Sequence, residues 1–118
     1  MASVRETIER EVTGWPGVEE KPHRFNGIEF RVNGHEIGHL HGDWWVDLPF
    51  PVRMRKELVS EGKARLHHVL PQTGWVSYPI RGEEDMEGVL ELFRLNYERL
   101  TAPKRGGEGR GDESSEGA

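Results

Sequence analysis

The chain has 118 residues, a formal net charge of −5 at pH 7 and no cysteine. Its length predicts one domain, its acidic balance argues against nucleic acid as a partner, and the missing cysteine excludes disulfides, thiolate catalysis and cysteine-based zinc sites. No apolar run approaches the roughly 20 residues that cross a bilayer, and the N-terminus lacks the apolar core of a signal peptide. We therefore expect a cytoplasmic protein with no membrane partner.

The chain begins with a helix signal that is followed by two strand signals. Ser3 and Glu6 form a capping box, and the apolar residues after them recur at helical spacing, which predicts a helix over 3–13. A weak strand is expected over 18–23. A half-buried strand is expected over 28–32, where apolar and charged residues alternate.

Asn33-Gly34 is the strongest hairpin signal in the chain, because a type I′ turn needs positive φ at both central residues. A two-residue loop pairs residue 32 with 35, 30 with 37 and 28 with 39. One face of the sheet is then predicted to carry Ile28, Phe30, Val32, His35, Ile37, His39 and His41 and, if Gly42-Asp43 is a second tight turn, Trp44, Val46 and Leu48. The residues between them, Glu36 included, fall on the opposite and wetter face.

Two helices and a second hairpin are predicted in the rest of the chain. Pro51 suits the first turn of a helix, which Gly62 ends. Strands over 65–70 and 74–80 form the hairpin, and apolar residues at helical spacing predict a last helix from 83 to about 100.

Runs of antiparallel strands with segregated helices predict an α+β, two-layer fold. We expect an antiparallel sheet of five or six strands with the helices on one side, in the order helix, three or four strands, helix, two strands, helix. Residues 1–100 form the single domain. Residues 101–118 are rich in glycine, serine and charge, which predicts a disordered tail. The order of elements resembles the architecture of secretion chaperones and YjbR-like proteins, with no function implied.

The histidines supply the first candidate functional residues. His39 and His41 are two apart on a predicted strand, so their side chains point the same way. With Asp47 and either His67 or His68 they could complete a set of histidine and carboxylate metal ligands. His67 and His68 are adjacent, so on a strand only one of them can join that face. The alternative is that the histidines bond backbone or carboxylate groups as part of the fold.

Asp47 allows two interpretations. It could accept hydrogen bonds from the free N–H groups of the helix that follows it, or it could orient a histidine as an acid–base partner.

Trp45 and Trp75 complete the candidate set. Trp44 and Trp45 are adjacent, so one of them must leave the core face. We expect Trp45 to be the exposed one, and an exposed tryptophan is a candidate contact for a ligand or for another subunit.

The neighbouring histidines also predict a pH effect. Partial burial and mutual repulsion disfavour the imidazolium form, so the pKa values of His39 and His41 should both lie below the ordinary value of about 6.5. The stability of the fold would then rise as the pH increases through that value. A contact with Asp47 would oppose the shift and could reverse it for the histidine concerned.

Two segments, GHEIGHLHGDWWVDLPFP over 34–51 and HHVLPQTGWVSYPIRGEEDMEG over 67–88, carry a family resemblance. Together they resemble the luciferase domain family of bacterial and fungal proteins, a family of otherwise unknown function. The resemblance covers about 17–100 and implies no catalytic residues that can be transferred. The sequence has no GxGxxG and no P-loop, so it contains no recognisable motif for a flavin or nucleotide cofactor.

Three functions are consistent with these residues. The first is a module that binds a small molecule in a pocket at a sheet end, lined by His39, His41, Asp47, His68, Trp45 and Trp75. The alternative is a small metal-assisted or His/Asp acid–base enzyme. The second alternative is a protein-interaction module, with a protein partner or a second copy of the chain.

Overall fold

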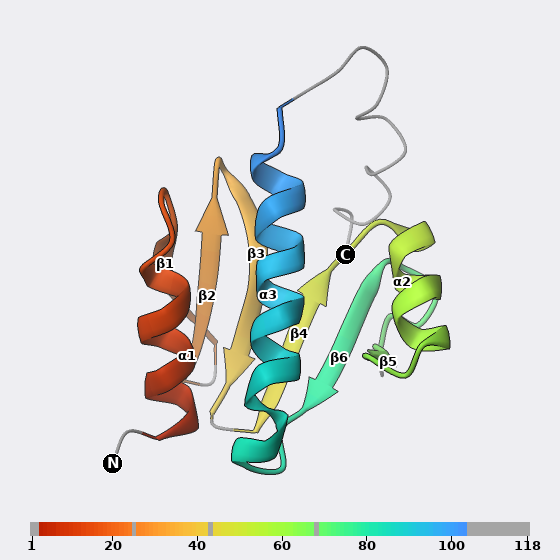
Figure 1. Cartoon of the computed structure of the whole chain (residues 1–118), viewed down its shortest axis with the longest axis horizontal. Coiled ribbons are helices and arrows are strands. Elements are labelled where there is room, and N and C mark those ends of the chain that lie inside the picture. The colour runs from red at the N-terminus through yellow and green to blue at the C-terminus, as the bar shows by residue number, and fades with distance from the viewer. Residues whose placement is uncertain (1–2, 25, 43, 68, 104–118) are drawn as a thin grey trace.

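The computed structural model describes residues 3–24, 26–42, 44–67 and 69–103. Six antiparallel strands form one sheet in the order β1-β2-β3-β4-β6-β5, and three α-helices cover one of its faces (Figure 1). The elements are α1 (Val4–Thr13), β1 (Glu19–His23), β2 (Gly27–Val32), β3 (His35–His41), β4 (Trp45–Pro49), α2 (Val52–Ser60), β5 (Arg65–Leu66), β6 (Trp75–Pro79), the 3-10 turn η1 (Glu83–Asp85) and α3 (Met86–Thr101). The predicted α+β, two-layer fold with helices on one side is confirmed.

The ends of the helices follow the local sequence. Ser3 Oγ accepts from the backbone N–H of Glu6 at 3.1 Å, and Glu6 Oε1 accepts from the backbone N–H of Ser3 at 3.0 Å, which completes the capping box. Gly62, with φ of +76°, follows α2. α3 runs to Thr101, the first residue of the predicted tail, and the tail beyond 103 lies outside the described residues. No described helix is long and apolar enough to span a bilayer.

The first hairpin has the predicted turn, but its register shifts after two residue pairs. Asn33 and Gly34 have φ of 54° and 81°, as a type I′ turn requires. Arg31 pairs with Glu36, and the next pair joins Phe30 to Gly38. The extra residue is Ile37 in β3, which makes a β-bulge, so the predicted pairing of 30 with 37 and 28 with 39 is wrong.

The loop after β3 also differs from the prediction. His41 pairs with Trp45, so the loop spans 42–44 rather than two residues. The predicted face that joined His39 and His41 to Trp44, Val46 and Leu48 is therefore wrong.

Burial of the apolar side chains explains the register of these strands. With the bulge and the longer loop, Leu40, Val46 and Leu48 all lie on the helix-covered face and are fully buried. Burying one such side chain stabilises the fold by about 1.5–3 kcal/mol, and a slip by one residue would expose the whole set. His39 and Asp47 are consequently placed on the other face.

The core lies between the sheet and the helices. Phe30 of β2 meets Phe93 of α3 edge to face, with ring centroids 5.5 Å apart. α3 can approach β3 closely because Gly38 has no side chain: a Cβ there would lie 2.9 Å from Phe93 Cε1. Asn96 of α3 is fully buried, and its Nδ2 donates to the carbonyls of Ile37 at 2.8 Å and Pro49 at 2.9 Å. α3 is thus fixed to both β3 and β4.

The second predicted hairpin is only partly formed. β5 ends at Leu66, where the prediction extended it to residue 70. Nδ1 of His67 accepts from the backbone N–H groups of Val69 at 3.1 Å and Leu70 at 3.0 Å. This closes the chain into a turn, because those amides donate to a side chain instead of to β6.

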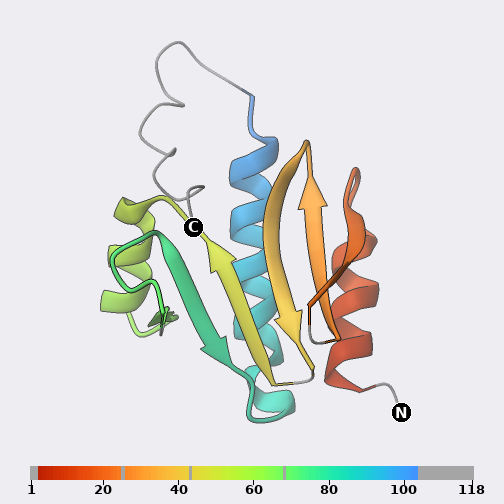
Figure 2. The same cartoon turned by 180° about the vertical axis from the view of Figure 1, so that it is seen from behind.

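The second face of the sheet carries no described helix. Figure 2 shows this face in front, with the helices behind the strands. The open face is where His23, His39, His41, Asp47 and Trp45 lie.

Replacing Gly34 with alanine should lower the free energy of unfolding by about 1 kcal/mol, the cost of a left-handed conformation for a residue with a Cβ. A Cβ at Gly34 meets no atom within 4 Å, so no steric clash adds to this cost. Urea denaturation measures the change. Gly14→Ala is the matched control, because Gly14 has φ of −77° and should change stability by less than about 0.5 kcal/mol. Equal stability of the two variants would contradict the turn.

Candidate functional site

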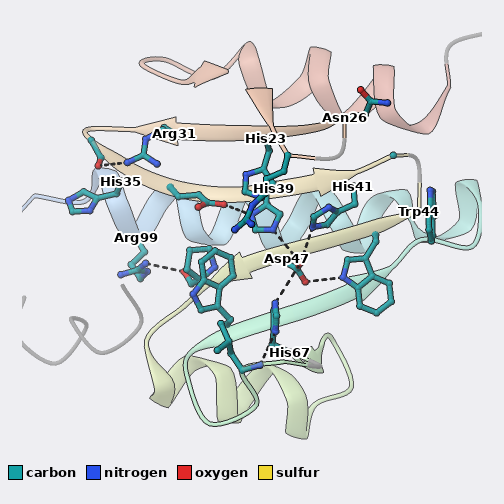
Figure 3. A pocket seen from close by; sticks show the side chains of 18 residues that line it. His23, Asn26, Arg31, His35, His39, His41, Trp44, Asp47, His67 and Arg99 are labelled. Carbon is teal, nitrogen blue, oxygen red and sulfur yellow. Dashed lines mark hydrogen bonds and ion pairs between the residues drawn. The ribbon is translucent and has the colours of Figure 1, made fainter. Parts of the chain in front are cut away.

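A cavity of about 1030 Å³ lies on the open face of the sheet. Five of the six histidines and three of the four tryptophans line it, together with the carboxylates of Glu36 and Asp47. The sixth histidine, His68, lies outside the described residues. Figure 3 shows His39, His41 and His67 around Asp47, with His23 beside His39. The cavity lies on the open face of the sheet, whereas the sequence analysis expected a pocket at a sheet end.

Asp47 of β4 is the centre of the cluster and is only 2% exposed. Its Oδ1 accepts from Ser77 Oγ at 2.7 Å and from the indole Nε1 of Trp45 at 3.0 Å. Ser77 is the direct cross-strand neighbour of Asp47 on β6, and Trp45 lies two residues earlier on the same strand face. These two donors hold the carboxylate in one orientation.

The second oxygen, Oδ2, faces three imidazoles. Nε2 of His39 and Nε2 of His41 each lie 3.3 Å away, and Nε2 of His67 lies 3.7 Å away. His39 is the cross-strand neighbour of Asp47 on β3, and His41 is two residues further along that strand. The carboxylate therefore does not cap α2, which was one of the two interpretations of the sequence.

His39 contacts a second carboxylate through its other nitrogen. Nδ1 of His39 lies 2.6 Å from Glu36 Oε2. Residues three apart on a regular strand would face opposite sides, and the bulge at Ile37 is what brings both onto the open face. This contact was missed from the sequence because the predicted register placed Glu36 on the opposite face from His39.

His23 of β1 joins the cluster at the edge of the sheet. Its ring stacks on that of His39, with centroids 4.0 Å apart and planes 14° apart. Nδ1 of His23 lies 3.2 Å from Glu29 Oε1, and Glu29 also accepts from Arg31. The sequence analysis did not identify His23, although its place on a strand next to β2 was the available signal.

His67 has a fixed tautomer. Its Nδ1 accepts hydrogen bonds from two backbone amides, so the proton of the neutral ring is on Nε2. That N–H points toward Asp47 Oδ2. The sequence left open which of His67 and His68 faces the site, and the structure brings His67 to it.

The tryptophans are placed differently from the prediction. Trp44 is 64% exposed, whereas Trp45 is half-buried and donates to Asp47. The three-residue loop turns Trp45 to the open face and leaves Trp44 at its rim. Trp75 was predicted as a site residue. It is buried, and the centroids of the Trp75 and His39 rings are 5.4 Å apart.

The carboxylates and histidines shift one another's pKa values. Burial lowers the pKa of His39, but hydrogen bonds to Asp47 and Glu36 outweigh it and raise the pKa to about 9. Burial and the charge of His39 lower the pKa of His41. Burial raises the pKa of Asp47, but His39 and Ser77 outweigh it and lower the pKa to about 2. The expectation of two lowered histidine pKa values holds in direction for His41 and is wrong for His39, which has two carboxylate partners.

The comparisons with known proteins agree with the resemblance seen in the sequence. A family model described as the luciferase domain matches residues 34–96, more than half of the 118-residue chain. The match contains His39, His41, Asp47 and His67, whereas His23 precedes it. No curated protein and no solved structure matches the chain, so the likeness to secretion chaperones and YjbR-like proteins stays a prediction.

NMR titration of the imidazoles in metal-free protein should separate the two central histidines. His39 should keep its proton to about pH 9, and His41 should lose its proton below 6.5. Because the pKa of folded His39 is raised, its contribution to stability is complete below pH 6.5 and is lost as the pH rises through about 9. A pKa at or below 6.5 for His39 would contradict the contacts with Glu36 and Asp47.

Replacing Asp47 with asparagine should lower the free energy of unfolding by about 3 kcal/mol, because the change breaks a buried ionic cluster. Since the folded pKa of Asp47 is lowered to about 2 from 3.8, the deficit should be full above pH 4 and should shrink as the pH falls toward 2. Glu57→Gln, on the exposed side of α2, is the control and should change stability by less than about 0.5 kcal/mol. A pH-independent deficit would argue against an ionised Asp47.

Proposed function

We propose that the chain, which belongs to the luciferase domain family, binds a small organic molecule in the open-face cavity. The observation that carries the proposal is the combination of aromatic walls with converging polar groups around Asp47 in one cavity of about 1030 Å³. Ligand sites in proteins are typically concave, largely apolar and about 300–1,000 Å³ in volume, with a few placed polar groups. The cavity fits this description.

The walls favour a flat, aromatic ligand. The indoles of Trp44 and Trp45 line the cavity near its rim, and the buried ring of Trp75 lies beside His39. Indole and imidazole faces pack well against other flat rings. Trp44 is 64% exposed although it is a large apolar side chain, and this surface would be covered by a bound ring.

The polar groups favour a ligand that carries oxygen atoms. Imidazole and indole N–H groups line the cavity, together with the guanidinium groups of Arg24, Arg31 and Arg99, which carry more N–H donors than the rings do. A phenol or an aromatic carboxylate offers a flat ring together with oxygen acceptors, and we infer that the ligand belongs to this class.

The proposal can be tested with a panel of phenols and aromatic carboxylates, with aliphatic carboxylates of similar size as the comparison. A ligand present at 100 times its Kd should stabilise the fold by about 2.7 kcal/mol, which thermal denaturation detects. Quenching of tryptophan fluorescence gives the affinity.

A matched pair of variants locates the binding. Trp44→Ala should weaken binding several-fold without unfolding the protein, because Trp44 lies outside the core. Leu66→Ala removes another exposed apolar side chain, 47% exposed and outside the cavity, and should leave the affinity unchanged. No stabilisation by any aromatic compound, or equal affinities for the two variants, would refute the proposal.

A further inference from the structure

We propose that the floor of the cavity is a binding site for a divalent transition-metal ion, with Asp47 Oδ2 and the Nε2 atoms of His39 and His41 as ligands and His23 as a fourth. This inference goes beyond the proposed function, since metal binding needs no organic ligand.

The distances from the two histidines to Asp47 suit a shared metal. Nε2 of His39 and Nε2 of His41 each lie 3.3 Å from Asp47 Oδ2. Bonds from a metal to imidazole nitrogen or carboxylate oxygen are about 2.0–2.2 Å long, so neighbouring ligand atoms in a tetrahedral or octahedral site are roughly 3.0–3.4 Å apart.

His23 is in place to add a third imidazole. One nitrogen from each of His23, His39 and His41 lies within 4.8 Å of the others. The His23 side chain belongs to the edge strand β1 and is 21% exposed, against 10% for the His39 side chain. The His23 ring is stacked on the His39 ring, so it would have to turn about its side-chain bonds to bring its nitrogen to bonding distance.

The outer contacts orient two of the rings for metal binding. Nδ1 of His39 lies 2.6 Å from Glu36 Oε2, and Nδ1 of His23 lies 3.2 Å from Glu29 Oε1. A histidine bound to a metal usually donates its other N–H to a carboxylate or carbonyl, which fixes the tautomer and leaves the second nitrogen free to bind. Two histidines of the cluster have this arrangement.

The remaining contacts fix the carboxylate. Ser77 and Trp45 occupy Oδ1 of Asp47, which leaves Oδ2 as the ligand atom. His67 carries its proton on Nε2 and is directed at the same oxygen, so it acts as an orienting donor and not as a ligand.

The charge of the cluster also favours a cation. Three carboxylates, those of Glu29, Glu36 and Asp47, surround the histidines, and Arg31 pairs with one of them. Imidazole and carboxylate ligands without any thiolate suit zinc, iron(II), cobalt or nickel. Two histidines and one carboxylate on one side of a metal leave open coordination positions, and in this cavity a ligand oxygen could occupy them.

The test uses the full-length chain, purified without an affinity tag. Elemental analysis gives the metal content as isolated. After treatment with a chelator, Zn²⁺ and Co²⁺ are titrated by calorimetry and, for Co²⁺, by its visible absorption. We expect one metal ion per chain, with an affinity that rises with pH because protons compete for the ligands.

Three variants locate the metal. His41→Ala, at a half-exposed position, should abolish the Co²⁺ spectrum. Glu36→Gln should weaken Zn²⁺ binding by about 10–100-fold, as is usual for an outer-shell partner. His35→Ala is the control, because His35 lines the same cavity but is exposed and outside the cluster.

The results separate the two proposals. Less than a tenth of an equivalent of metal as isolated, together with no saturable Zn²⁺ or Co²⁺ binding, would overturn the metal site and leave the binding of aromatic ligands intact. Loss of binding in His35→Ala equal to that in His41→Ala would also overturn it, as surface binding. Metal binding without any response to the aromatic panel would refute only the proposed function.

Discussion

One extra residue in β3 determines which side chains share the open face of the sheet. Without the bulge at Ile37, the regular alternation along β3 would place Glu36 and His39 on opposite faces, and His39 would lie on the same face as Phe30. The bulge reverses this alternation at the point where Gly38 passes under α3. Bulges often re-aim side chains next to functional sites. Here the bulge brings a carboxylate and a histidine from one short segment within 2.6 Å of each other.

The open face combines groups that are costly to bury separately. An isolated buried carboxylate costs several kcal/mol, and Asp47 is only 2% exposed. Its two oxygens face five side chains that carry donor groups, contributed by β3, β4, β6 and the turn after β5. These donor groups reach Asp47 only when the strands are correctly paired. The cluster therefore links the pairing of the strands to the chemistry of the cavity, and a change at either affects the other.

The parts of the fold that depend on adjacent residues could be predicted from the sequence. The capping box at Ser3 and the turn at Asn33-Gly34 follow from the chemistry of two or four residues. The register beyond the turn could not, because it depends on the burial of apolar side chains from several strands and on the packing of α3. His39, His41 and Asp47 were recognised by residue type. Glu36 could not be recognised as a partner of His39, because the contact depends on the bulge. His67 is directed toward Asp47 by hydrogen bonds from two backbone amides of a turn. The sequence analysis had predicted a strand in place of that turn.

The two edges of the sheet also affect how the protein behaves at high concentration. An unprotected edge strand can pair with another chain and start aggregation. The β1 edge contains Pro22, which has no N–H to donate, preceded by the charged residues Glu19, Glu20 and Lys21. The other edge, β5, has only two residues. Neither edge offers a long row of free backbone groups, so the sheet resists edge-to-edge pairing with other copies of the chain. A partner that binds by adding a strand would find few backbone groups to pair with.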